Sequence, residues 1–356
     1  MTTICLAIRP SAGVRRYSQV AVRSWRTAAT LPSHFVFHHS VEHALRSSDR
    51  VPVVALESAI VTHGLPYDTN LEVARRCETA VREAGAVPAT TALIDGKIHV
   101  GVSDEQLQRL SESAASGHRL ATSTKTSRRD IPYILSSKKL GGTTVSATAM
   151  IASLAGIDFF ATGGVGGVHR GGERTFDISS DLTTLSEFPI NIFCSGVKSI
   201  LSLPLTLEYL ETQNVPVYSF APKGRFPAFY TSQSDLYVTP VEDDASAADI
   251  IWTTKNVIAQ QPGSLFAVPI PRQYEEEGLA IQKQVEQAVK ESVEKGVDQR
   301  GKQVTPWLLQ RVSELSKGNS LKSNEALVVN NAATAARIAV KYRQLEQHRE
   351  NDAVGS

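Results

Sequence analysis

Residues 145–164 read VSATAMIASLAGIDFFATGG, and they contain one helix-to-strand unit. The small residues of Val145–Leu154 predict a helix, and the apolar residues of Asp158–Thr162 predict a buried strand that ends in glycines. A helix that leads directly into a buried strand is typical of α/β proteins, in which helices cover a central sheet.

The same alternation continues on both sides of this unit. Val51–Leu56 is a compact apolar run, Asn70–Ala84 has apolar residues at helical spacing, and Pro88–Val100 predicts a two-stranded hairpin. Ser103 and Gln106 form a capping box for the helix that follows. Towards the C-terminus, the predicted elements are strands at Asn191–Cys194, Val215–Phe220 and Leu265–Val268, and helices at Ser199–Thr212, Ala245–Gln260, Glu275–Lys295, Pro306–Leu315 and Asn324–Gln347. The pattern predicts an α/β/α sandwich, with a mixed central sheet and helices on both of its faces.

Composition excludes several classes of protein. The 356 residues are 42% hydrophobic and 21% charged, with a net charge of +1, which excludes a mostly disordered chain, a collagen-like chain and a polybasic nucleic-acid binder. No run of about 18 apolar residues occurs, so we expect no membrane span. The three cysteines are far apart, which argues against a disulfide framework or zinc site and for a reducing compartment.

The first 41 residues differ in composition from the rest. They contain five arginines and no acid, and the first acid is Glu42. An Arg-rich, Ser-rich, acid-poor start predicts a mitochondrial transit peptide; the alternative is a basic tail with no address on a cytoplasmic protein. We therefore expect a leader at 1–41, a single domain at 42–348 and a polar tail at 349–356. Without the leader the chain is mildly acidic, which disfavours nucleic acids as partners.

Two side chains follow predicted strands directly. Glu57 ends the strand at Val51–Leu56, where α/β folds place ligands. Burial there would raise its pKa and suit it to general acid catalysis, although a carboxylate that caps the next turn is an equal alternative. Lys198 follows the strand Asn191–Cys194, and we expect it to open a helix. The positive end of the helix dipole and burial would then lower its pKa and make it a nucleophile, whereas the simpler alternative is a surface lysine.

Two further segments have the composition of anion sites. Residues 124–130 include Lys125, Arg128 and Arg129, which could hold a phosphate or form a solvated charge run. In residues 163–172, six of ten positions are glycine, and His169 and Arg170 stand among them. Glycines let backbone N–H groups approach an anion, although a mobile connection has the same composition. The glycine spacing fits neither a P-loop nor a dinucleotide-binding loop.

A cluster of acids and hydroxyls lies just beyond the glycines. Asp177 and Asp181 are four residues apart, with Ser179 and Ser180 between them. Oxygen ligands of this kind suit Mg²⁺ or Mn²⁺. The two aspartates as helix N-caps are the alternative on sequence alone.

Taken together, the chain resembles the pseudouridine-5′-phosphate glycosidase family from about Val51 to about Arg343. Nine separate stretches carry the resemblance in order, which makes it far more specific than any one motif: Pro52–Ser58, Ala86–Thr90, Ser127–Asp130, Ala161–Gly171, Thr175–Ser179, Lys198–Leu201, Leu207–Thr212, Phe226–Tyr230 and Ser320–Asn324.

The resemblance implies an activity and its site. Enzymes of this family reversibly split the C–C glycosidic bond of pseudouridine 5′-phosphate into uracil and ribose 5-phosphate, which is the pseudouridylate synthase reaction of a lyase. The resemblance implies a homotrimer and a divalent metal, commonly Mn²⁺. It also implies that Glu57 is the proton donor that opens the ribose ring, that Lys198 forms a Schiff base and that Asp177 is the metal ligand. The substrate-site residues that it implies are Lys125, Val145, Ser179, Ser180 and Asp181, with Thr162, His169 and Asn324 as candidates for phosphate or uracil contacts.

Some positions depart from the family pattern. Ala59 stands where the family often has threonine, and Ser195 and Val197 replace small alanines beside the lysine. Two other functions stay open: a Schiff-base lyase or aldolase that acts on another sugar phosphate, and a non-catalytic phosphosugar-binding protein. The presence of both Glu57 and Lys198 argues against the second.

Overall fold

The structure is a computed structural model that describes residues 31–47, 50–114, 123–232, 234–259, 262–297 and 304–355. Eleven strands form one sheet, in which nine follow the order β1-β4-β3-β2-β7-β8-β11-β9-β10 and β6 pairs with both β3 and β5. The strands are β1 Phe35–Phe37, β2 Val53–Leu56, β3 Val87–Ile94, β4 Lys97–Val100, β5 Thr124–Thr126, β6 Gly141–Thr143, β7 Phe159–Ala161, β8 Asn191–Cys194, β9 Val217–Ser219, β10 Thr239–Pro240 and β11 Ser264–Ala267.

The centre of the sheet is parallel and buried. β2, β7, β8 and β11 are parallel to their neighbours, and every residue of these four strands is buried. Continuous apolar runs are what strands covered on both faces require, which is why the sequence pattern located them. The β3–β4 hairpin and the β3–β6 pair are antiparallel, so the sheet is mixed, as predicted.

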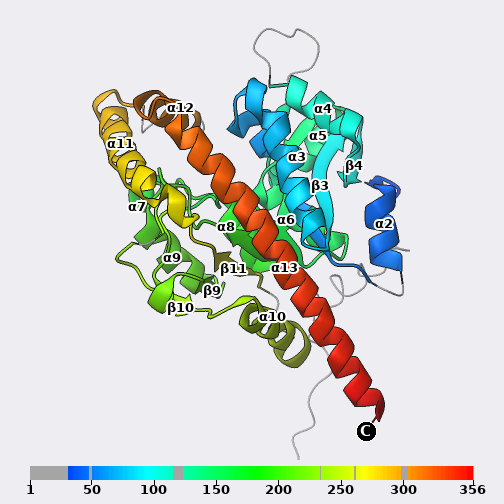
Figure 1. The fold of residues 1–356 in the computed structure, drawn as a ribbon. Coiled ribbons are helices and arrows are strands. Elements are labelled where there is room, and N and C mark those ends of the chain that lie inside the picture. The colour runs from blue at the N-terminus through cyan, green and yellow to red at the C-terminus, as the bar shows by residue number, and fades with distance from the viewer. Residues whose placement is uncertain are drawn as a thin grey trace, which may run out of the picture.

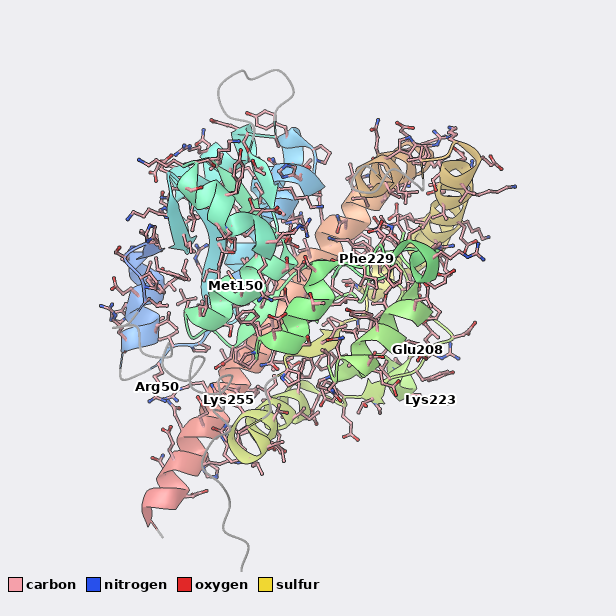
Figure 2. The ribbon with its side chains drawn as sticks, turned by 180° about the vertical axis from the view of Figure 1, so that it is seen from behind. Arg50, Met150, Glu208, Lys223, Phe229 and Lys255 are labelled. Carbon is pink, nitrogen blue, oxygen red and sulfur yellow. The ribbon has the colours of Figure 1, made fainter. Side chains whose placement is uncertain are left out.

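Helices cover both faces of the sheet (Figure 1). The longer helices are α2 His39–Arg46, α3 Tyr67–Glu83, α4 Asp104–Glu112, α5 Ile131–Ser136, α6 Val145–Leu154, α8 Ser180–Glu187, α9 Leu203–Thr212, α10 Asp244–Thr253, α11 Glu275–Glu294, α12 Val304–Leu315 and α13 Asn319–Gly355; α7 Gly172–Thr175 is a single turn. One face carries α3, α10 and α13; α3 and α10 each pack on α13, and α13 contacts β2, β7 and β8. Figure 2, seen from behind, shows α6 at its Met150 label on the opposite face, where it contacts β2, β3 and β7. This arrangement confirms the α/β/α sandwich.

Both ends of the predicted domain differ from the expectation. β1 pairs with β4 and α2 begins at His39, so the predicted boundary at residue 41 falls inside a helix of the fold. The backbone hydrogen bonds of the sheet edge hold this segment, and its short mixed sequence gave no periodic signal. Residues 1–30 of the predicted leader lie outside the described residues.

At the other end, 349–355 continue α13 and do not form a separate polar tail. Arg349 donates to the Asp249 carboxylate at 2.7 Å, and its guanidinium lies 3.8 Å from the centre of the Trp252 ring. These contacts to α10 hold the polar end of the helix in place. Among the helices of the described ranges, none is long and apolar enough to cross a membrane.

Candidate active site

A cavity of about 270 Å³ opens at the carboxyl ends of β2, β7 and β8. Glu57 follows β2, Gly163 and Gly164 follow β7, and Lys198 follows β8, so three neighbouring strands bring distant parts of the sequence together. Of the eleven predicted site residues, nine line this cavity: Glu57, Lys125, His169, Asp177, Ser179, Ser180, Asp181, Lys198 and Asn324.

The other two predicted residues do not line the cavity. The Val145 side chain is 1% exposed at the first position of α6, and its neighbour Thr144 contributes to the wall instead. Thr162 is also 1% exposed, and its hydroxyl donates to the Glu57 carboxylate. The resemblance implied both residues, and they do stand at a strand end and a helix start beside the cavity, but other side chains there form its wall.

The Glu57 carboxylate is half-buried at the floor of the cavity. Removal from water raises its pKa, and the Lys198 charge and the Thr162 hydrogen bond oppose this rise. Its hydrogen-bond partner is Thr162, which follows the neighbouring strand β7 and does not belong to the turn that follows β2. The environment therefore favours the acid over the turn-capping alternative.

Lys198 does not open a helix, which corrects the sequence prediction. The next helix, α9, begins only at Leu203, with Pro204 in its first turn. The Lys198 N–H donates to the Val165 carbonyl at 3.1 Å, and Val165 and Val197 form a β-bridge. The glycine-rich loop thus extends the β7–β8 pairing past the strand ends and holds the half-buried Lys198 in the cavity without a helix dipole.

Glycine is required where this extension crowds other backbone. Gly196 has φ +84°, and a Cβ there would lie 2.6 Å from the Pro227 carbonyl oxygen. A Cβ on Gly166 would lie 2.3 Å from the Ser179 hydroxyl. The glycines of this segment therefore permit close backbone approach, which is not the behaviour expected of a mobile connection.

The cations of residues 124–130 divide between two places. Lys125 and Arg129 line the cavity, whereas Arg128 pairs with Glu187 at 2.5 Å and lies over the Phe188 ring. Partial removal from water, and then the charge of Lys198, lower the pKa of Lys125; Glu57 and Asp181 oppose this. Lys125 and Arg129 can therefore contact an anionic ligand in the cavity, whereas Arg128 forms an ion pair with α8.

Asp181 uses both carboxylate oxygens within the protein. Oδ1 accepts from the Ser146 N–H at 2.9 Å, and Oδ2 accepts from the Gly166 N–H at 2.8 Å. The carboxylate thus ties the glycine-rich loop to the start of α6. Neither aspartate is the N-cap of α8, because Ser179 occupies that position.

Asp177 faces the cavity beside His169, with 3.9 Å between the nearest carboxylate oxygen and ring nitrogen. Burial lowers the pKa of His169, against the attraction of Asp177. Within the described residues, no three His, Cys, Asp or Glu side chains gather as a metal site. A cation at Asp177 would therefore need water or substrate oxygens as its other ligands, a pattern that Mg²⁺ and Mn²⁺ accept.

Comparisons with known proteins identify the family of this chain. The family model described as "Indigoidine synthase A like protein" matches residues 40–341. Pseudouridine-5′-phosphate glycosidase of Caldanaerobacter subterraneus subsp. tengcongensis is 48% identical over 298 residues, covering 83% of this chain and 94% of the relative. The glycosidase of Mycoplasmopsis agalactiae is 46% identical, covering 87% and 98%. The chain belongs to the pseudouridine-5′-phosphate glycosidase family.

Two solved structures are similar across almost the whole glycosidase domain. The prealnumycin C-glycosynthase AlnA, solved in complex with ribulose 5-phosphate, has a TM-score of 0.78 and 32% identity, and covers 89% of this chain and 100% of its own. An indigoidine synthase A-like protein from Thermotoga maritima has a TM-score of 0.73 and 31% identity, covering 88% and 98%. The resemblance and the fold predicted from the sequence are thereby confirmed.

Sequence reasoning about this glycosidase missed several cavity residues. His63 lies in the single π-helical turn Ile60–Gly64, and its Nδ1 is 2.7 Å from the Thr62 hydroxyl. Phe229 and Tyr230 form an apolar wall, with their rings edge to face at 4.8 Å. A turn histidine gave no signal of its own, and the stretch Phe226–Tyr230 contributed to the resemblance without a role for its aromatic side chains.

Proposed function

We propose that this chain reversibly cleaves the C–C glycosidic bond of pseudouridine 5′-phosphate to give uracil and ribose 5-phosphate. The observation that carries the proposal is a carboxyl with a raised pKa, Glu57, in one cavity with the amine of Lys198. The uracil carbon has no heteroatom that an ordinary glycosidase could protonate. An opened sugar bound as an iminium supplies the electron sink that this bond needs instead.

The proposed steps use these two groups. Glu57 gives its proton to the ribose ring oxygen as the C1′–O bond breaks, and the Lys198 nitrogen bonds to C1′. The new C1′–N bond leaves the nitrogen positively charged, and it loses a proton to the Glu57 carboxylate. The C1′–C5 bond then breaks as the nitrogen electron pair forms the iminium, and uracil C5 takes the bonding pair and this proton from Glu57. Water hydrolyses the iminium to ribose 5-phosphate and the ammonium of Lys198, which returns a proton to Glu57 and so regenerates both the amine and the acid. One water is consumed, and the reverse sequence makes the C–C bond.

The 5′-phosphate has a suitable place beside the start of α6. Lys125, Ser127, Arg129 and Thr144 line that side of the cavity. The N-terminus of a helix and two cations together favour a phosphate dianion. The ribulose 5-phosphate in the AlnA complex supports a sugar phosphate as the ligand class.

A divalent cation, which we propose to be Mn²⁺, fits the donor set at Asp177. The Asp177 carboxylate would hold it, and Ser179 and His169 line the same wall. When bound, the ion would offset negative charge on the substrate.

Replacing Asp177 by alanine should abolish the metal-dependent part of the activity and leave the fold intact. Within the described residues, the contact that the carboxylate would lose is its 3.9 Å pair with His169. Chelated protein should be titrated with Mn²⁺, with binding read by electron paramagnetic resonance and turnover by uracil release. Glu173→Ala, an exposed acid in α7, is the matched control and should behave as wild type. Full activity of Asp177→Ala in chelator would exclude this site.

The function is tested with the full-length chain, pseudouridine 5′-phosphate and Mn²⁺. We expect uracil and ribose 5-phosphate to form in equal amounts, and chromatography measures both products. Turnover of other sugar phosphates with no uracil from this substrate would favour the lyase or aldolase alternative. Binding of the substrate without any turnover would favour the non-catalytic protein.

We also propose a mitochondrial address and a homotrimer. The five arginines and the lack of acids before Glu42 motivate the address. A fluorescent protein fused to residues 1–34, which end before β1, should enter mitochondria, and a diffuse cytosolic signal would refute this.

The homotrimer is tested by sedimentation equilibrium, which should give three times the mass of one chain.

A further inference from the structure

Asn331 lies in α13 with its side chain completely buried against the ends of β7 and β8. Its amide nitrogen donates to the Thr162 carbonyl at 2.9 Å and to the Gly163 carbonyl at 3.3 Å. The same nitrogen lies 3.1 Å from the Ser195 hydroxyl, which also lies 3.3 Å from the amide oxygen. One side chain therefore joins both strand ends to the helix that crosses them (Figure 1).

Of the two connections that Asn331 joins, the one after β8 carries the amine, and the one after β7 carries the hydrogen-bond partner of the acid. Thr162 carries the hydroxyl that donates to Glu57. Ser195 begins the segment Ser195–Lys198, and its N–H donates to the Gly163 carbonyl at 2.9 Å. Hydrogen bonds thus link Glu57 to Thr162, Thr162 to Asn331 and Asn331 to Ser195, and the main chain continues from Ser195 to Lys198.

Asparagine is well suited to this position. Past the end of β7, the Thr162 carbonyl accepts from the Asn331 amide, and a buried carbonyl without a partner is costly. An amide supplies two donors and one acceptor without a charge, which matches two carbonyls and a hydroxyl. The carbonyls accept only, so they also determine which way the amide faces.

The same network reaches the aromatic wall. The Ser195 carbonyl accepts from the Phe229 N–H at 3.1 Å. Phe229 has φ +66°, and its ring lies so close to Gly164 that a Cβ there would be 2.6 Å from it. A shift of Ser195 would therefore displace the amine and part of the substrate wall together.

We infer that Asn331 is a positioning residue that sets Glu57 and Lys198 relative to each other for C–C bond cleavage. This inference rests on the proposed function. Asn331 does not line the cavity and so touches no substrate. Its effect is on kcat, because it aligns reacting groups and adds nothing to ground-state binding.

The test is the isosteric variant Asn331→Asp, in which the amide NH2 group, with both of its donors, becomes a carboxylate oxygen that faces two carbonyls. We expect kcat to fall about 10²-fold, the cost of a misplacement of about 1 Å, with KM for pseudouridine 5′-phosphate unchanged. Borohydride trapping of ribose 5-phosphate on Lys198 should slow by the same factor. Asn330→Asp is the matched control: it is the neighbouring residue in α13, and within the described residues its amide donates to the Pro269 carbonyl at 3.3 Å. This control should keep wild-type kcat.

A second variant keeps the inference testable if Asn331→Asp fails to fold. Ser195→Ala removes the hydroxyl and preserves the two Asn331–carbonyl bonds, so kcat should fall less and the melting temperature should stay near that of wild type. If Asn331→Asp folds, wild-type kcat or a rise in KM alone would overturn the inference. If Asn331→Asp does not fold, wild-type kcat in Ser195→Ala would overturn it. If the wild-type protein itself releases no uracil, the proposed function fails first.

Discussion

Lys198→Ala should remove turnover, with a loss of at least about 10⁴-fold in kcat. The variant retains the cavity and the burial that raises the pKa of Glu57, but it has no amine to bond to C1′. Lys198→Arg should fail equally, because a guanidinium stays protonated and is no nucleophile. The backbone contacts of residue 198 to Val165 are main-chain bonds, so both variants should fold.

Borohydride trapping measures this prediction directly. Wild-type protein with ribose 5-phosphate should give a stable secondary amine, and mass spectrometry should place the adduct on the peptide that contains Lys198. Lys139→Ala is the control, since Lys139 is exposed and its ammonium donates to the Tyr133 hydroxyl, outside the cavity. The rival amine is Lys125, whose pKa is lowered by partial burial and by Lys198. An adduct on Lys125, or turnover by Lys198→Ala, would overturn the mechanism and leave the fold assignment intact.

Glu57→Gln should lower kcat by about 10²- to 10⁴-fold, the usual contribution of a general acid. Glutamine has the same shape, and its amide oxygen can still accept from Thr162, so we expect the fold to persist. Steady-state uracil release and the melting temperature of the same sample separate loss of chemistry from loss of structure. Asn324→Asp would be a poor control because Asn324 also lines the cavity, so the exposed Glu173→Gln is preferable.

The pH dependence of cleavage follows from the same residue. Burial raises the pKa of Glu57, and the facing charges of Lys198 and Lys125 oppose this while Asp181 adds to it. The proton-donating form therefore persists above the ordinary glutamate range, and it is lost as pH rises through the raised pKa. Cleavage should show an alkaline limb that Glu57→Gln lacks. An identical limb in the variant would assign it to another group.

The sequence was sufficient for the elements that are buried on both faces. β2 is an unbroken apolar run, and β8 and β11 are apolar after their first residues, because every residue in these strands is buried. The small residues of Val145–Leu154 indicated α6 for the same reason, since seven of its ten residues are buried. By contrast, β5 and β6 are three residues long and consist of Thr, Lys and Gly, so no period could be read from them.

The candidate site divides in the same way. Polar residues directly after buried strands identified Glu57 and Lys198, because carboxyl ends of parallel strands share one edge. The sequence did not show which partner each polar side chain takes. Thr162 donates a hydrogen bond to Glu57, Arg128 forms an ion pair with Glu187, and Asp181 accepts from two backbone amides. Each of these depends on directions and distances between segments far apart in the chain.

Asn331 shows the limit most clearly. In the sequence it is one of two adjacent asparagines in an otherwise apolar helical stretch, and nothing distinguishes it from Asn330. In the fold, a rotation of about 100° along the helix points one amide at the carbonyls of Thr162 and Gly163 and the other at Pro269. The sequence alone determined the layers, the strand ends and the acid and amine placed there, because burial leaves a periodic pattern in composition. Only the tertiary structure decided which hydrogen bonds position them, because these bonds depend on how α13 crosses the sheet.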